Sequence, residues 1–187
     1  KYEISQQQYV EFLNSLTYDQ QKSRTFNDPI SEAGTYAMFA GFHHRNGIRI
    51  LTPGNNAAIP AVYACDATAG VENNSDDGQA IANSGMSYAD LSAYLDWAAL
   101  RPMTEMEFEK ICRGTQPRVA GEYAWGTTDI APINSFSAGL INDFQANETY
   151  TPAINGACAV AVGSISGVYG PLKVGVFATG TSGRASS

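Results

Sequence analysis

A run of oxygen-bearing side chains at residues 73–78 is the first feature of this sequence that suggests metal chemistry. The candidate ligands are Asn73, Ser75, Asp76 and Asp77, followed by Gly78, with Asp66 as a further carboxylate. Alternating oxygen ligands ahead of a glycine are typical of the first half of an EF-hand calcium loop. The second half is not matched, because Ser84 stands where a bidentate glutamate closes such a loop. The pattern therefore predicts either a calcium site or an ordinary polar turn.

Three cysteines and one histidine pair are further candidates for metal or redox chemistry. Cys65, Cys112 and Cys158 lie far apart, without the C-x-x-C spacing of zinc sites and thioredoxin-like centres. Cys112 falls on the apolar face of an expected helix, which indicates a buried thiol. Cys65 and Cys158 either bridge two strands in an oxidising compartment or stay reduced. His43 and His44 point to opposite sides of an extended chain, so we expect surface or partly packed histidines rather than a metal site.

The acidic run at residues 101–114 could suggest acid–base catalysis, but its spacing favours a helix. Thr104 and Glu107 have the spacing of a capping box, and Gly114 can end the helix in the left-handed conformation. The apolar face, which we expect to be packed, consists of Phe108, Ile111 and Cys112. We expect caps, ion pairs and surface rather than catalytic acids at Arg101, Glu105, Glu107 and Glu109.

Two further helices and several strands must position these side chains. Ser5 with Gln8 begins the first helix, and Ser87 begins another. Their expected buried stripes are Tyr9, Phe12, Leu13 and Leu16, and Leu91, Tyr94, Leu95 and Ala98. Short strands are predicted near residues 48–51, 61–65, 158–162 and 174–178, joined by connections rich in Gly, Asn, Ser and Thr. Much of the backbone is therefore expected to be irregular.

Three motifs resemble the formylglycine-generating enzyme, or sulfatase-modifying factor, family, and they follow one another along the chain in the family's order. The run R-P-M-T-E-M-E-F-E-K with R-G, followed by Y-A-W-G, is similar to the family's R-L-P-T-E-A-E-W-E-x-A-A-R-G and Y-P-W-G. The run Y-E-I-S-Q-Q-Q-Y is similar to its opening Y-E-V-T-N-x-x-Y, and S-Y-A-D starts a segment like its V-S-W-x-D-A. The resemblance covers about residues 1–126.

The resemblance implies an α+β fold that is irregular and loop-rich. This sulfatase-modifying-factor fold is related to C-type lectin domains, with short antiparallel strands and about three short helices. The 187 residues, 44% hydrophobic and 16% charged, are expected to form one domain over 1–187. That domain would be incomplete at both ends and carry a polar insertion at about 18–80.

Composition and charge argue against two classes of partner. The formal net charge is −7 with 11 basic residues, so we expect no nucleic-acid partner, because phosphate binding needs a concentrated Lys/Arg surface. The longest apolar run, at residues 157–162, is too short to span a bilayer. An extracytoplasmic bacterial location, secreted or on the cell surface, is expected from the resemblance alone.

The family's copper-binding cysteine pair follows a G-N-V-W-E-W motif, and neither is found in this sequence. Cys112 and Cys158 do not occupy the copper-ligand positions, so enzyme activity is not the first expectation. We expect a non-catalytic binding or assembly domain that takes a protein or glycan ligand. One alternative is a copper-dependent oxidase that converts a substrate cysteine to formylglycine, with its active site beyond Ser187. A relation to iron-dependent sulfoxide synthases ranks last, because no H-x-x-x-H-x-E spacing occurs.

The expected strand at 174–178 has a consequence for assembly. It would leave unpaired amides and carbonyls at a sheet edge, which proteins normally cover. We therefore expect that the chain continues beyond Ser187, or that a partner or neighbouring subunit completes the fold.

Overall fold

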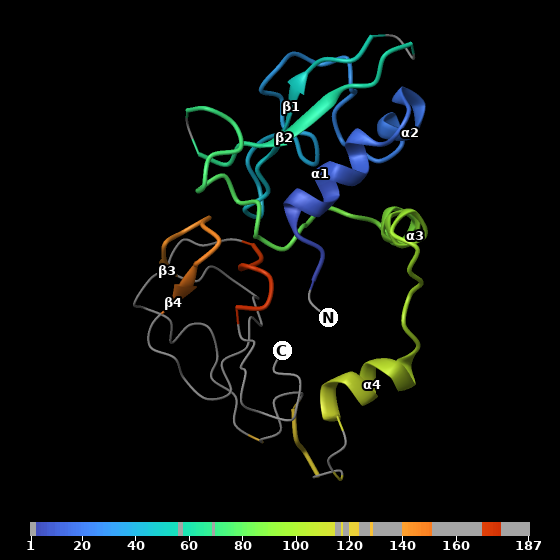
Figure 1. Cartoon of the computed structure of the whole chain (residues 1–187), viewed down its shortest axis with the longest axis vertical. Helices are drawn as coiled ribbons and strands as arrows, with labels where there is room; N and C mark the ends of the chain where they lie inside the picture. Colours follow the sequence, from blue (N-terminus) through green and yellow to red (C-terminus); the bar gives the residue numbers. More distant parts are fainter. Residues whose placement is uncertain are drawn as a thin grey trace.

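A computed structural model describes residues 3–55, 58–68, 70–114, 117, 120–123, 128, 140–150 and 170–176. Within these residues the chain is a mixed α/β protein with four helices and two small antiparallel sheets of two strands each (Figure 1). The elements in chain order are α1 (Gln6–Asn14), α2 (Tyr18–Lys22), β1 (Ile48–Thr52), β2 (Val62–Cys65), α3 (Tyr88–Trp97), α4 (Glu105–Arg113), β3 (Leu140–Ile141) and β4 (Thr149–Tyr150). Among the described helices, none has the length and apolar character needed to cross a membrane.

Helix α1 forms as the sequence predicts. The Ser5 hydroxyl accepts a hydrogen bond from the Gln8 amide at 3.2 Å, and the Gln8 side chain accepts one from the Ser5 amide at 3.0 Å. This capping box satisfies backbone donors that the first helical turn leaves unpaired. The predicted stripe is confirmed, because Tyr9, Phe12 and Leu13 are buried and Leu16 is partly buried against the same cluster.

The main sheet pairs β1 with β2 where strands were predicted. Ile48 lies opposite Cys65 and Ile50 opposite Tyr63, with an irregularity between Ile50 and Thr52. The side chain of Asn14, at the end of α1, donates to the carbonyl of Tyr63 at 3.0 Å and accepts from its amide at 2.8 Å. Helix α1 is thereby fixed against β2, and its buried stripe covers the sheet.

The segment at 18–80, expected as a polar insertion, contributes much of this core. It contains α2, β1 and β2. Its buried apolar side chains include Ala37, Met38, Ile48, Ile50, Ala61, Tyr63 and Cys65. Helix α2 was not predicted, so the described chain has four helices rather than about three. A capping box of Thr17 and Gln20, T-x-x-Q in the sequence, is the signal that could have located it.

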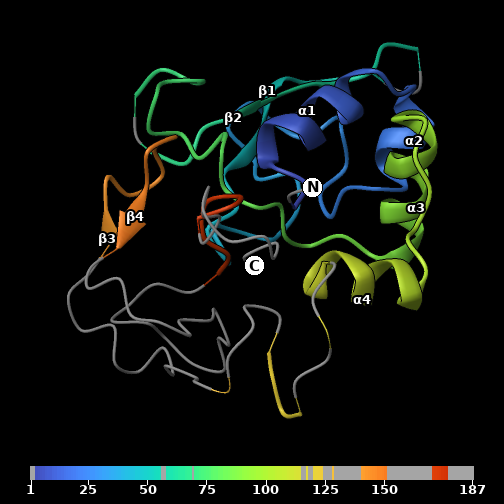
Figure 2. The ribbon, with the colours of Figure 1, turned by 60° about the horizontal axis from the view of Figure 1, so that its bottom comes forward.

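Helix α3 packs on α1 through aromatic side chains. Its cap is the predicted Ser87, whose hydroxyl accepts from the Asp90 amide at 3.2 Å. Tyr94 is buried, and its ring centroid lies 5.6 Å from that of Phe12. Trp97 also contacts Phe12, at 5.6 Å between centroids. In Figure 2, α3 lies on the side of α1 that faces away from β3 and β4, and these rings join the two helices.

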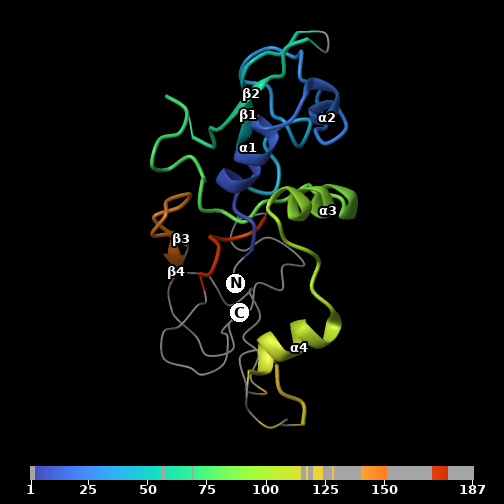
Figure 3. The same cartoon turned by 45° about the vertical axis from the view of Figure 1, so that its right-hand side comes forward.

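Helix α4 lies apart from the elements that build the core (Figure 3). Its cap at Thr104 and its glycine end are as predicted, with Gly114 at φ 65°. The prediction of a packed apolar face is wrong for Phe108 and Ile111, which are both about half exposed. The cause is position rather than sequence, because α4 follows an irregular connection that carries it away from α1 and α3. The side chain of Cys112 lies outside the described residues.

The predicted strand at 174–178 is also wrong over its described part. Lys173 forms an isolated bridge with Ile81, and the Val174 amide donates to the carbonyl of Ala80 at 2.8 Å. The chain then turns, because Gly175 adopts a left-handed φ of 65° that no strand residue takes. Residues 174–176 therefore expose no strand edge. Residues 177–178 and the predicted strand at 158–162 lie outside the described residues.

Candidate functional site

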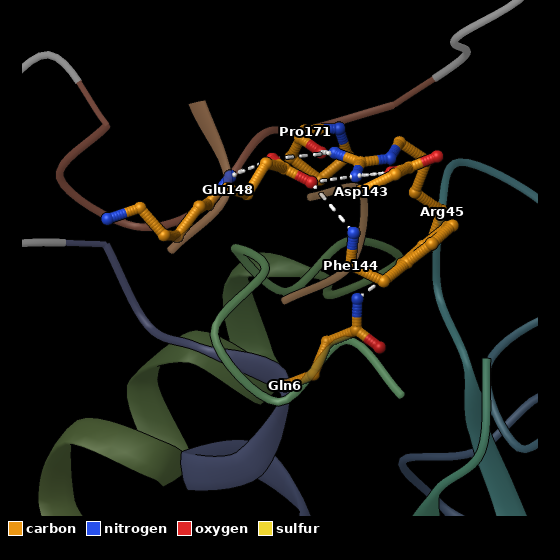
Figure 4. Close-up of polar contacts among 7 residues, drawn as sticks. Gln6, Arg45, Asp143, Phe144, Glu148 and Pro171 are labelled. Atoms are coloured by element: carbon orange, nitrogen blue, oxygen red, sulfur yellow. Dashed lines mark hydrogen bonds and ion pairs between the residues drawn. The ribbon is translucent and has the colours of Figure 1, made fainter. Parts of the chain in front are cut away.

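Arg45 and Glu148 form a buried ion pair between segments far apart in the sequence (Figure 4). The side chain of Arg45 is 4% exposed and that of Glu148 is fully buried. Arg45 Nη1 lies 3.3 Å from one carboxylate oxygen of Glu148, and Nη2 donates to the other. Arg45 also donates to the carbonyl of Pro171 at 2.6 Å and to the half-exposed carboxylate of Asp143 at 2.5 Å. We call this pair the Arg45–Glu148 clamp.

The clamp leaves no acceptor position of Glu148 without a donor. Besides Arg45, the carboxylate accepts the amide of Phe144 at 3.0 Å and that of Lys173 at 2.9 Å. A buried charge is tolerated only when it is paired and fully hydrogen-bonded. Glu148 is therefore a structural anion that joins three segments of the chain, and not a general base with a free lone pair.

Backbone strain is concentrated around the clamp. Non-glycine residues with left-handed φ include His44, Arg45, Asn142 and Phe144, at 52–62°. Such residues are uncommon and cost free energy unless the surroundings hold them. Gln6 supplies part of that support through its side chain. The Gln6 side-chain nitrogen donates to the Arg45 carbonyl at 2.7 Å, and the side-chain oxygen accepts from the Gly47 backbone amide at 2.9 Å.

A stack of aromatic rings and guanidinium groups extends from the clamp to the surface. The Arg45 guanidinium lies 4.6 Å from the Phe144 ring centroid, and Phe144 lies 5.9 Å from Phe42. The ring centroid of Phe42 lies 6.0 Å from that of Tyr36. The Arg49 guanidinium lies over the Tyr36 ring, 4.3 Å from its centroid. Cation–π and ring contacts of this kind hold the loop carrying Phe42 against the segment carrying Phe144.

The candidate calcium ligands lie in a turn that is closed by Asp77. This buried carboxylate accepts from the Thr68 amide and hydroxyl at 3.1 and 2.9 Å and from the Asn74 amide at 2.6 Å. The Asn73 side chain accepts from the Cys65 amide at 3.3 Å, while Ser75 is exposed and Asp76 half-buried. In the described part of the chain, no three His, Cys, Asp or Glu side chains are grouped to hold a metal. The hydrogen bonds of Asp77 and Asn73 are of the kind that an ordinary polar turn makes, and the calcium alternative stays a prediction.

The remaining predicted candidates lie at separate places. Cys65 is a free, buried thiol whose pKa burial raises to about 12, so it is protonated at neutral pH. A free thiol at Cys65 is the state in which the cysteines stay reduced. The proposed disulfide partner, Cys158, lies outside the described residues. His43 and His44 are exposed beside Phe39, as expected for surface histidines.

The acidic residues of the motif helix act as predicted where their contacts are known. Arg101 makes two hydrogen bonds to the carboxylate of Glu107, at 2.8 and 2.5 Å. The same carboxylate accepts from the Thr104 amide at 2.8 Å. Arg101 first, and then Thr104, lower the pKa of Glu107 to about 2. Glu107 is therefore an anion that caps α4.

We expect α4 to lose its cap in acid. Because the folded pKa of Glu107 lies below its ordinary value of 4.5, its contribution to helix stability is complete above pH 4.5 and disappears as the pH falls to about 2. An NMR pH titration of the α4 amides measures this loss. The control is Glu107→Gln, which retains Glu105 and Glu109 and should lack the transition. A Glu107 carboxyl that titrates near 4.5 would contradict the prediction.

The exposed surface of α4 and its preceding connection is apolar. Its large side chains are Met106 (81% exposed), Leu100 (61%), Phe108 (57%), Met103 (55%) and Ile111 (47%). Part of this surface is an open groove of about 640 Å³ lined by Ala99, Leu100, Arg101, Met103, Glu107, Lys110 and Ile111. We call the exposed apolar side chains of Leu100, Met103, Met106, Phe108 and Ile111 the α4 surface.

Sequence reasoning located the α4 motif but not the clamp. Arg45 and Glu148 lie 103 residues apart, and neither belongs to a motif or a local pattern. No family model, no curated protein and no solved structure matches the chain. The resemblance to the formylglycine-generating enzyme family therefore stays a prediction from the sequence motifs.

Proposed function

We propose that the chain is a non-catalytic, extracytoplasmic domain of the formylglycine-generating enzyme-like, C-type-lectin-related fold, and that it binds a protein partner. The observation that carries the proposal is the α4 surface, where the family-like motif presents exposed Met and Phe side chains. Contiguous exposed apolar surface on a soluble protein commonly marks an interaction site. The cap and ion pair of Glu107 give this surface a fixed helical backbone.

The chemistry of the groove favours a protein over a glycan. Its apolar lining is aliphatic with one methionine, through Leu100, Met103 and Ile111, and its charged side chains are Arg101, Glu107 and Lys110. Flexible methionines adapt to apolar side chains of a partner, as at other protein-binding surfaces. Glycan sites instead need many aligned polar groups around the sugar hydroxyls. We therefore commit to an apolar protein segment as the ligand.

The described residues do not fit the copper site of the alternative oxidase. That site needs a pair of cysteine ligands, and Cys65, the one cysteine whose side chain the structure describes, is buried. The side chains of Cys112 and Cys158 lie outside the described residues. Copper analysis of the purified protein, with turnover on a cysteine-containing peptide, tests the alternative separately from partner binding.

The double variant Met103→Glu with Ile111→Glu tests the α4 surface. A photo-crosslinking residue at Met106 in producing cells identifies the partner, and the affinity of the purified pair is then measured by calorimetry. We expect the double variant to weaken binding at least ~30-fold, the effect of one hot-spot residue. Both positions are half exposed, so the folded state should be retained.

The matched control is Val71→Glu, which places the same charge at a 65% exposed apolar position outside the α4 surface. Its affinity should equal that of the native protein. Equal affinity for the control and the double variant would refute the α4 surface. Cross-links only between copies of this chain would replace the partner by a second subunit.

A further inference from the structure

We propose that residues 140–150 form a strap that the Arg45–Glu148 clamp fastens to the core, and that this strap opens as a unit while the core stays folded. Its strands β3 and β4 pair with each other and not with β1 or β2. In Figure 1 they lie away from the main sheet. Within the part of the chain that the structure describes, the strap is therefore a local structure attached to the core by a few contacts.

Those contacts are concentrated on Arg45. Among the strap residues whose side chains are described, Glu148 alone is buried, while Ile141, Asn142 and Asp143 are exposed. Outside the clamp, the Phe144 carbonyl accepts from the Gly78 amide at 3.1 Å, and the Phe144 ring contacts Phe42. Among the described residues, little apolar surface thus opposes release, and the attachment depends on a charge pair that is favourable only while both partners are present.

Backbone strain favours opening. Within the strap, Asn142 and Phe144 hold left-handed φ values of 55° and 62°, a conformation that costs L-residues free energy. The Phe144 amide is fixed in place by its hydrogen bond to Glu148. Release of Glu148 from Arg45 would therefore also relax these residues.

The neighbouring segment 170–176 provides an internal comparison. It shares the clamp through Pro171 and Lys173. It also has its own attachment, because Leu172 is buried and its carbonyl accepts from the Ala82 amide at 3.0 Å. We therefore expect segment 170–176 to stay on the core when the strap opens, which would uncover the guanidinium of Arg45 and the ring of Phe42.

Residue-resolved amide hydrogen exchange by NMR tests the strap in the whole chain. Glu148→Gln removes the charge and places an amide group among the donors. We expect the amides of Phe144 and Gln145 to exchange at least ~100-fold faster, since loss of one partner of a buried pair has an effect of this size or larger. The core amides of Ala37 and Ile50 should change less than ~3-fold. Asp143→Asn, which keeps an acceptor at the half-exposed position, is the matched control and should accelerate the strap less than ~10-fold.

Each contrary outcome is distinct. Equal acceleration of strap and core amides, or a Glu148→Gln protein without a folded core, would show that the clamp belongs to the global unfolding unit and would overturn the proposal. Unchanged strap amides would overturn it as well. Native-state exchange of the unaltered protein in low denaturant is a second measurement. In that experiment the strap amides must show a smaller free energy of opening than the amides of Ala37 and Ile50. A single common value for all of these amides contradicts the proposal.

Discussion

Replacing Phe12 with alanine is expected to lower the free energy of unfolding by about 3–5 kcal/mol. The Phe12 ring is 1% exposed and lies 5.6 Å from the centroids of Tyr9, Tyr94 and Trp97. Its removal leaves a cavity where α1 meets α3, because the surrounding rings can collapse only in part. Urea unfolding followed by tryptophan fluorescence measures the loss, and Trp97 reports on the same contact.

The matched control is Phe26→Ala. Phe26 is 66% exposed, so the same deletion should change the free energy of unfolding by less than about 0.5 kcal/mol. A loss below about 1 kcal/mol for Phe12→Ala would mean that the aromatic contacts between α1 and α3 form outside the cooperative unit.

The helix starts could be predicted because they are set by residues three positions apart. Ser5 and Thr104 each cap a helix with the partner that the sequence indicated, and Ser87 caps a helix at the predicted start. Capping depends on local spacing and needs no knowledge of the rest of the fold. The strands β1 and β2 were predicted for a similar reason, because apolar and β-branched residues are concentrated at 48–52 and 61–65.

Predictions that depended on distant neighbours were less successful. The pattern of Phe108 and Ile111 specifies an amphipathic helix, but an apolar stripe does not reveal whether another element covers it. The apolar run at 174–176 suggested a strand, yet Gly175 turns the chain after one bridge at Lys173. In the first case the tertiary context was missing, whereas in the second the glycine within the run was itself a local signal against a strand.

The candidate sites show the same limit more strongly. The run at 73–78 has the composition of a metal loop, whereas Asp77 receives donors from Thr68 and Asn74 in the structure. Arg45 and Glu148 gave no signal, because charged residues in a sequence are expected at the surface by default. A buried pair is defined by contacts across 103 residues, which composition and periodicity do not encode.

Gln21→Leu is expected to lower the free energy of unfolding by about 2–4 kcal/mol. The Gln21 side chain is fully buried, accepts from the Ala61 amide at 2.8 Å and donates to the Ala61 carbonyl at 2.9 Å. It also donates to the carbonyl of Leu13 at 3.0 Å. Leucine fills a similar volume, so the loss comes from buried backbone groups without partners and not from a cavity. Thermal and urea unfolding measure it.

Two comparison variants separate lost hydrogen bonds from changed helix propensity. Gln7→Leu alters a helical glutamine whose side chain donates to exposed Glu11 and accepts only from the weak thiol donor of Cys65 at 3.9 Å, and should change stability by less than about 0.5 kcal/mol. Gln21→Glu keeps an acceptor for the Ala61 amide but removes both donations, so it should destabilise at least as much as Gln21→Leu near neutral pH. If Gln21→Leu were neutral while Gln21→Glu was destabilising, water must reach Ala61. The Gln21 side chain would then only occupy space in the core. It would not be the link between Leu13 of α1 and Ala61, just before β2, that its three hydrogen bonds indicate.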